Sequence, residues 1–364
     1  MSMFTVDNLL GPSMRTVSLC IILTMAALNG DAFAADGVVY YPRGSCIPAQ
    51  SLVQDDGDTG ASHRGRTLAD AFRFGQPNFV GVESMVTSWS SLQCKFADGR
   101  PRLIVLLAAF RLAFQDEKDW DASLAKVNAL KKAFPDAPFS VLAEAQYWAY
   151  YAWDARGSGY AASVTPDGWR LFKERMENAE KVLVGNKAVG STLPNWYELM
   201  IEVHTALGHS ADERNTTFLE GATRYKTYLQ TYITMRNYLE PKWGGSWKAV
   251  DSLVDWSVSN TKDTEGQSMY ARLYKGVYYN LEPGKSIFKE TLVKWPRMKA
   301  GFEDLMRLYP ESKANLNDFA ALACEAGDKK TFLSLRKKIG KDYIKESWEK
   351  NYSLELCEAK FGYK

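Results

Sequence analysis

The sequence predicts an all-α protein of stacked helical hairpins that follow an irregular N-terminal segment. Three observations lead to this fold class. Apolar residues recur at helical spacing through most of the chain after residue 78. No run of alternating apolar and polar residues is long enough to predict a strand. A pattern of tryptophan, helix and proline occurs twice, once from Trp120 to Pro135 and once from Trp295 to Pro310.

The N-terminus has the three parts of an export signal. Arg15 supplies a positive charge, residues 17–28 form an apolar run, and an A-x-A cleavage site ends at Ala34. The run is shorter than the about 20 apolar residues that a membrane span needs. We therefore predict a signal peptide over residues 1–34 and a periplasmic or secreted mature chain, the alternative being a buried N-terminal helix. The signal is complete from Met14 onward, which is the expected start, although an upstream methionine stays open.

Four cysteines remain after cleavage, and an even number in an exported chain predicts disulfides. They are Cys46, Cys94, Cys324 and Cys357. Three connectivities are possible, and proximity in the sequence favours Cys46–Cys94 and Cys324–Cys357. The alternative is four buried thiols. No pair has C-x-x-C spacing, which disfavours a zinc ribbon or a thioredoxin-like site.

The mature chain divides into three parts by its hydrophobic pattern. Residues 35–77 lack a clear period, and the Gly/Asp-rich stretch 54–65 predicts a loop. Residues 78–285 form the predicted helical core, and residues 286–364 the predicted C-terminal helical hairpins.

The expected helices are justified by apolar spacing, caps and prolines. Pro135 ends one of them, and Thr165-Pro166 begins another with a cap residue followed by proline. The run 103–114 is strongly apolar but contains Arg111, and it predicts a core helix. The segments in chain order are 82–89, 103–114, 120–134, 147–153, 166–183, 194–203, 212–239, 246–259, 265–279 and 288–308.

One internal repeat strengthens the hairpin prediction. In each copy a tryptophan precedes an aromatic-proline pair by fourteen residues, and an alanine follows the proline by ten. The matching positions are Trp120 and Trp295, Leu130 and Leu305, Phe134-Pro135 and Tyr309-Pro310, and Ala145 and Ala320. Small residues let the two helices of a hairpin approach closely. The pattern predicts stacked helical hairpins of the kind found in TPR-like solenoids.

Several short strings of the chain resemble a known family. They are the A-W-x-A-R-G-x-G motif at residues 152–159, Gly168-Trp169, Pro194-Asn195-Trp196-Tyr197 and Pro241-Lys242-Trp243-Gly244-Gly245. Together they resemble a family of uncharacterised bacterial proteins with a helical, TPR-like domain of unknown function. The resemblance spans roughly residues 79–279. It implies a helical fold and brings no catalytic residue, because the family has no established activity.

Several classes of function lack support in the sequence. The formal net charge of +2, without a Lys/Arg block, predicts no nucleic-acid partner. No later apolar run reaches about 18 residues, so we predict no membrane span in the mature chain. No nucleotide-binding or hydrolase motif occurs, which predicts no cofactor.

The sequence also predicts no metal site. His204 and His209 are five residues apart rather than the four that place two ligands on one helical turn. A weak calcium pattern at Asp55, Asp56 and Asp58 lacks the final glutamate of an EF-hand loop.

The candidate binding residues are aromatic and charged side chains near helix ends. They are Glu144, Trp148, Tyr151, Arg156, Trp169, Trp196 and Trp243. Arg156 ends a helix before Gly157, so it either bonds the last carbonyls or forms a clamp for an anion or carboxylate. Trp196 and Trp243 either anchor neighbouring helices or stack on a ligand.

We expect an exported, non-catalytic helical-repeat protein that binds a peptide or protein partner through this aromatic and arginine-lined face. The alternative is a helical enzyme acting on a cell-wall or other glycan. It would need a deep pocket with two carboxylates about 5–10 Å apart. Glu144, Asp154 and Glu198 are the nearest acids in the sequence.

Overall fold

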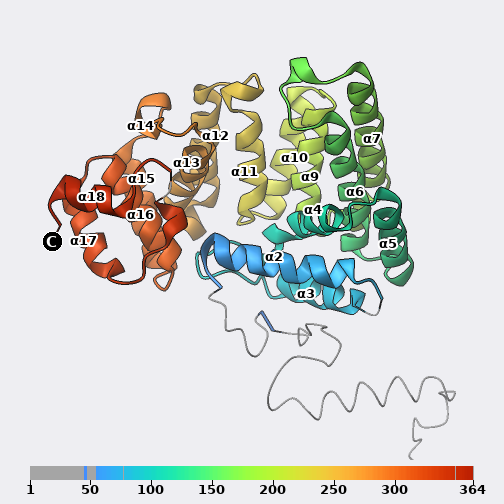
Figure 1. The fold of residues 1–364 in the computed structure, drawn as a ribbon, viewed down its shortest axis with the longest axis horizontal. Helices are drawn as coiled ribbons and strands as arrows, with labels where there is room; N and C mark the ends of the chain where they lie inside the picture. The colour runs from blue at the N-terminus through green and yellow to red at the C-terminus, as the bar shows by residue number, and fades with distance from the viewer. Residues whose placement is uncertain (1–44, 47–54, 77, 349, 364) are drawn as a thin grey trace, which may run out of the picture.

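The described part of the chain is all-α, as predicted (Figure 1). The structure is a computed structural model, and it describes residues 45–46, 55–76, 78–348 and 350–363. The predicted signal peptide, with its cleavage site at Ala34, lies outside these residues. Within them the only extended pairing is an isolated bridge between Lys95 and Pro101. No helix in the described ranges is both long and apolar enough to cross a membrane.

The helices follow one another across the molecule in chain order, and α2 and α3 cross beneath their ends (Figure 1). Short 3-10 turns at Arg102–Val105, Ala161–Ser163, Pro241–Trp243 and Lys345–Ser347 join some of them. The α-helices are α2 (Gly57–Arg73), α3 (Phe79–Ser91), α4 (Leu106–Glu117), α5 (Trp120–Ala133), α6 (Pro138–Arg156), α7 (Pro166–Gly185), α8 (Lys187–Gly190), α9 (Asn195–Ala206), α10 (Ala211–Arg224), α11 (Leu229–Tyr238), α12 (Trp247–Glu265), α13 (Ser268–Asn280), α14 (Ile287–Glu290), α15 (Trp295–Leu308), α16 (Lys313–Glu325), α17 (Lys329–Ile339) and α18 (Leu354–Phe361).

Two hydrophobic clusters form the core, and α9 contributes to both. Leu199 and Val203 pack into the N-terminal cluster, whereas Ile201 packs into the C-terminal cluster. A helix with apolar residues on two faces is expected to be buried between neighbours. The acids of α9 lie between these clusters, with Glu202 buried and Glu198 partly exposed.

The internal repeat corresponds to two hairpins, α5–α6 and α15–α16. In both, the tryptophan starts the first helix and its indole nitrogen donates to an aspartate near the end of the hairpin. Trp120 binds Asp154 at 3.1 Å, and Trp295 binds Asp328 at 3.1 Å. The repeat thus includes a hydrogen bond that the sequence comparison did not reveal.

The loop predicted at residues 54–65 is wrong from residue 57 onward, and the irregular segment predicted at residues 35–77 is wrong over residues 57–73, because α2 occupies these positions. Its first glycine, Gly57, is required by close packing. A Cβ on Gly57 would lie 2.8 Å from the Cβ of Ala314, and one on Gly65 would touch the side chain of Val105. Gly57 also has a φ of +58°, which favours glycine. A helix rich in glycine is possible here because tertiary packing outweighs its low propensity.

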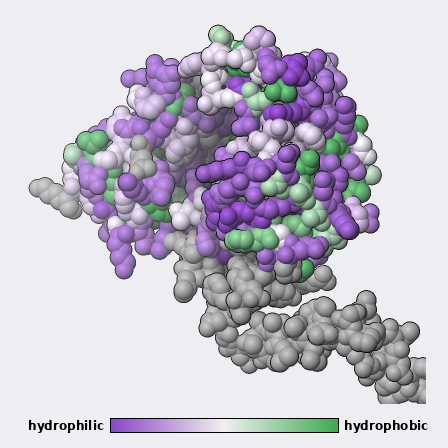
Figure 2. Space-filling model, turned by 45° about the vertical axis from the view of Figure 1, so that its right-hand side comes forward, coloured by the Kyte–Doolittle hydropathy of each residue, from purple (hydrophilic) through white to green (hydrophobic). Residues whose placement is uncertain are grey.

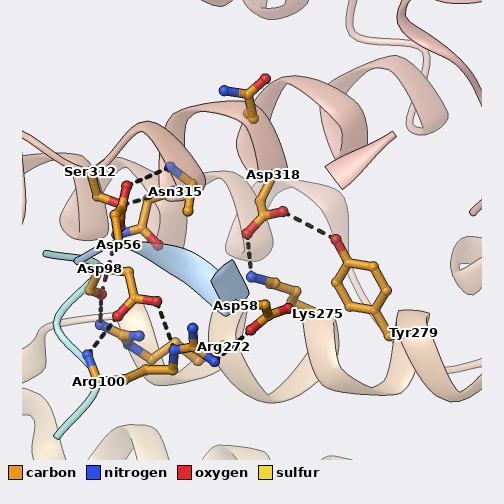
Figure 3. A network of polar contacts seen from close by, with 12 residues as sticks. Asp56, Asp58, Asp98, Arg100, Arg272, Lys275, Tyr279, Ser312, Asn315 and Asp318 are labelled. Carbon is orange, nitrogen blue, oxygen red and sulfur yellow. Dashed lines mark hydrogen bonds and ion pairs between the residues drawn. The ribbon is translucent and has the colours of Figure 1, made fainter. Parts of the chain in front are cut away.

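A network of polar contacts joins α2 and the 95–100 segment to α13 and α16 (Figure 3). Asp56 precedes α2, but its carboxylate accepts from the Ser312 hydroxyl at 2.8 Å and from the Ala314 backbone N–H at 2.9 Å. It therefore binds the N-terminus of α16, where a negative charge is favoured. The carbonyl of Asp98 accepts from Arg272 at 2.7 Å. We call these contacts the closing network, because they link segments more than 170 residues apart.

Both disulfides favoured by sequence proximity are present. Cys46 is bonded to Cys94 and Cys324 to Cys357. The first ties the segment before α2 to the residues after α3, and the second ties α16 to α18. Each closes a loop of several tens of residues, which restricts the unfolded chain.

Two of the expected long helices are each divided in the structure. The segment 212–239 breaks at Tyr225–Tyr228, and 288–308 becomes α14 and α15. The first break contains neither glycine nor proline, so the sequence did not reveal it. Its cause is tertiary: the hydroxyl of Tyr225 donates to the Ser191 carbonyl at 2.9 Å, and that of Tyr228 donates to Glu198 at 3.0 Å.

Candidate functional site

A pocket of about 430 Å³ opens among α4, α6, α9, α11 and α13. The volume lies within the usual range for ligand sites. Twelve residues line it: Arg111, Tyr150, Trp153, Glu198, Glu202, Gln230, Thr234, Asn237, Tyr238, Lys242, Trp243 and Asn280. We call it the inter-helix pocket. On a larger scale the molecule is hollowed between its two ends, and hydrophilic residues predominate around the hollow (Figure 2).

Glu202 of α9 is bound by two donors from other helices. Its carboxylate accepts from Arg111 Nη2 at 2.7 Å and from the Trp153 indole nitrogen at 2.8 Å. The carboxylate in turn favours the charged form of Arg111 and raises the pKa of that guanidinium. Arg111, the single charge in the apolar run 103–114, is thus explained by a partner 91 residues away.

Glu198 lies one helical turn before Glu202 and has a different environment. Burial raises its pKa to about 8, and the nearby charge of Glu202 adds to the effect. The Tyr228 hydroxyl donates to Glu198 at 3.0 Å and accepts from the amide of Asn195 at 2.7 Å. At neutral pH Glu198 is therefore a neutral acid beside a charged carboxylate. Side chains four residues apart on a helix have Cβ atoms about 5–6 Å apart.

The far end of the pocket is formed by a second polar cluster on α11 and α13. The Asn280 amide donates to Asn237 Oδ1 at 3.1 Å and to Glu240 Oε1 at 3.0 Å. Lys242 forms an ion pair with Glu240 at 3.1 Å. Arg236 lies 3.8 Å from the same carboxylate, and the amide groups have further donor and acceptor capacity.

Trp243 is the most exposed large ring of the pocket, with 49% of its surface accessible. Its ring meets that of Tyr238 edge to face at 6.0 Å. The two glycines that follow it close a tight turn. Gly244 has a φ of +85°, and a Cβ on Gly245 would lie 2.0 Å from the Leu239 carbonyl oxygen. The Trp-Gly-Gly string is therefore a helix-to-helix turn that also holds a tryptophan at the pocket.

The other binding residues predicted from the sequence do not share one surface. Trp196 is 3% exposed, and its indole donates to the Leu183 carbonyl at 3.0 Å. Tyr151 stacks on Trp120 at 4.3 Å and carries the Arg175 guanidinium on its ring. These two aromatic side chains pack helices together.

Glu144 and Trp148 lie on α6 in partly buried positions. Glu144 forms an ion pair with Lys131 of α5. The Trp148 ring packs edge to face on Tyr147 at 5.1 Å. The Glu144 ion pair links α6 to α5, whereas the Trp148 ring contact lies within α6.

Arg156 makes the contacts of a helix-end residue. Its guanidinium donates to the carbonyls of Gly157 and Gly159, each at 3.0 Å. It also lies 5.6 Å from the Trp153 ring and 5.2 Å from that of Trp169, which is 39% exposed. Arg156 and Trp169 form a separate surface that meets the pocket only through Trp153.

Comparison of the chain with family models, with curated proteins and with solved structures found no match. The resemblance to a TPR-like family therefore stays a prediction. Any assignment of function rests on the geometry of the pocket itself.

Proposed function

We propose that the protein is an exported, non-catalytic helical-repeat protein that binds a peptide segment in the inter-helix pocket. The observation that supports this most is that five helices place aromatic rings, an arginine and side-chain amides around one cavity. Aromatic residues and arginine are enriched at binding hot spots. The two disulfides support the export part of the proposal, because such bonds persist in oxidising compartments.

The polarity of the pocket suggests which peptide it binds. Arg111 is balanced by Glu202, Lys242 by Glu240, and Glu198 is neutral at neutral pH. The two cations that line the pocket, Arg111 and Lys242, are therefore each already paired with a carboxylate. The amides can bond a peptide backbone while the rings contact its side chains. We therefore expect a preference for extended segments with uncharged, apolar or aromatic side chains.

The test compares two exposed tryptophans on two surfaces. Trp243→Ala alters the pocket, whereas Trp169→Ala alters the surface around Arg156. Peptides selected from a random library are titrated into the purified protein by calorimetry. We expect Trp243→Ala to weaken binding at least about tenfold, the effect of a hot-spot residue, and Trp169→Ala to leave it unchanged. The reverse result would move the site to the Arg156 surface. If the library yields no peptide that binds, the proposal of peptide binding is contradicted.

The acid pair supports a second candidate, an enzyme that cleaves a glycan. Glycoside hydrolysis uses one protonated and one charged carboxyl group, and the environments of Glu198 and Glu202 separate them in this way. Release of reducing ends from cell-wall glycans, abolished in Glu198→Gln, would favour the enzyme. We rank it second because Arg111 and Trp153 already occupy the Glu202 carboxylate.

A further inference from the structure

Two of the three histidines of the chain meet at the end of α9, away from the lining of the inter-helix pocket. The Nδ1 atoms of His204 and His209 are 3.1 Å apart, and the ring centroids are 4.9 Å apart. Five residues separate them, a spacing that a continuous helix would place on different faces. The end of the helix explains their contact.

The backbone after α9 folds as a Schellman motif. The N–H of His209 donates to the His204 carbonyl at 2.9 Å, and that of Gly208 donates to the Thr205 carbonyl at 3.2 Å. Gly208 has the left-handed φ of +71° that this motif needs. The motif brings His209, two positions after the C-cap residue, against His204, the third residue from the end of the helix. Their approach is thus fixed by the backbone and does not depend on side-chain freedom alone.

Glu180 of α7 completes a three-residue cluster with these rings. Its Oε1 lies 3.3 Å from His209 Nε2. With one ligand atom taken from each of the three side chains, all three atoms lie within 4.8 Å of one another. His204 is buried, whereas His209 and Glu180 each have 25% of the side chain exposed. The cluster is therefore held from inside and open to solvent on one side.

Neighbouring side chains orient the rings as outer partners do in metal sites. The Thr217 hydroxyl of α10 lies 3.1 Å from His204 Nε2, which leaves Nδ1 of that ring directed at the cluster. We take Nε2 of His209, which faces Glu180, as its ligand atom; the Glu213 carboxylate then lies 3.5 Å from Nδ1, the other ring nitrogen, while its second oxygen accepts from the Ser210 backbone in a capping box. Such partners fix ring orientation and tautomer in metal sites.

We propose that Glu180, His204 and His209 bind one divalent transition-metal ion, for which Zn²⁺ is the best fit. Two imidazoles and a carboxylate are a ligand set that zinc accepts, with water in the fourth position. Tetrahedral zinc ligands are about 3.3 Å apart, so side-chain rotations that move a ligand atom by up to about 1.5 Å complete the site. The ion would link α7 to the α9–α10 turn, whether or not a peptide occupies the pocket.

The experiment uses the full chain without a histidine tag, treated with a chelator and titrated with ZnCl₂ by calorimetry. We expect one Zn²⁺ per chain and a melting temperature that rises with zinc. His209→Gln and Glu180→Gln should each weaken binding at least about tenfold, because each removes a ligand. Both side chains are partly exposed, so the variants are expected to fold, which circular dichroism checks.

Matched controls make the assignment specific. His63→Gln removes the third histidine, and Glu177→Gln removes another acid of α7, so both should bind zinc as the wild type does. Absence of stoichiometric zinc binding would overturn the proposal and leave a hydrogen-bonded cluster. Binding that survives His209→Gln and Glu180→Gln would overturn it as well. Zinc binding that is lost to the same extent in His63→Gln or Glu177→Gln would also overturn the proposal.

Discussion

The closing network and the inter-helix pocket both concentrate acids, bases and tyrosines, but they distribute their partners differently. In the closing network, Asp56 of the N-terminal segment binds two donors at the start of α16, 256 and 258 residues away. In the pocket, Glu198 and Glu202 lie on one helix, and burial raises the pKa of Glu198. Hydrogen bonds between such distant residues determine how the N-terminal segment packs against the C-terminal helices. A buried acid that faces a cavity has a protonation state that a ligand can change.

Of the two regions, the closing network is expected to show the larger effect. Asp56→Ala leaves the Ser312 hydroxyl and the Ala314 N–H without their acceptor in a buried place, and we expect a loss of about 3 kcal/mol in the free energy of unfolding. Denaturation in urea measures it. The matched control is Asp58→Ala, whose side chain is 67% exposed in its ion pair with Arg100. Exposed pairs contribute about 0–1 kcal/mol. Equal losses in the two variants would contradict the role given to Asp56.

The next effect separates the two regions by pH. The pKa of Glu198 is about 8 in the folded protein and 4.5 in the reference state, so between these values the folded chain keeps a proton that the unfolded chain has lost. The stabilisation that Glu198 contributes is complete below its unfolded pKa of 4.5, and it is lost as pH rises through its folded pKa of about 8. The free energy of unfolding falls by at most about 1.4 kcal/mol per pH unit in this range.

Glu198→Gln isolates this contribution, because glutamine resembles the neutral acid and does not titrate. Between about pH 6 and about pH 7 the wild type should lose stability relative to Glu198→Gln. Urea denaturation at several pH values gives the difference directly. Parallel curves for the two proteins would mean that Glu198 is already ionised, and the proposed neutral acid would be wrong.

The same distinction between local and distant partners explains what the sequence could predict. The α5–α6 and α15–α16 hairpins were predictable, because helical period, Trp120, Trp295 and the following prolines are local signals. Helix α2 was not, because its glycines are needed only by contacts such as that of Gly57 with Ala314. Low local propensity predicted a loop where tertiary packing required a helix.

The candidate site, like the fold, was predictable only where its residues leave a local signal in the sequence. Trp243 and Glu198 were identified from the sequence and line the pocket. The pairing of Arg111 with Glu202 spans 91 residues and leaves no local signal, although an arginine in an apolar helix indicates a buried partner. The meeting of His204 with His209 was missed because the spacing rule assumed a continuous helix. Gly208 between them was the available signal of a helix end.

The smallest expected change in stability belongs to the residue we expect to matter most for binding. Trp243 is half exposed at the pocket, so Trp243→Ala should alter the free energy of unfolding by less than about 0.5 kcal/mol. Trp196→Ala, the same substitution in the core, should cost about 3 to 5 kcal/mol. Thermal and urea unfolding of the two variants measure the contrast. A large loss in Trp243→Ala would mean that this tryptophan anchors the α11–α12 turn, and weaker peptide binding in that variant would then reflect a damaged fold rather than a lost contact.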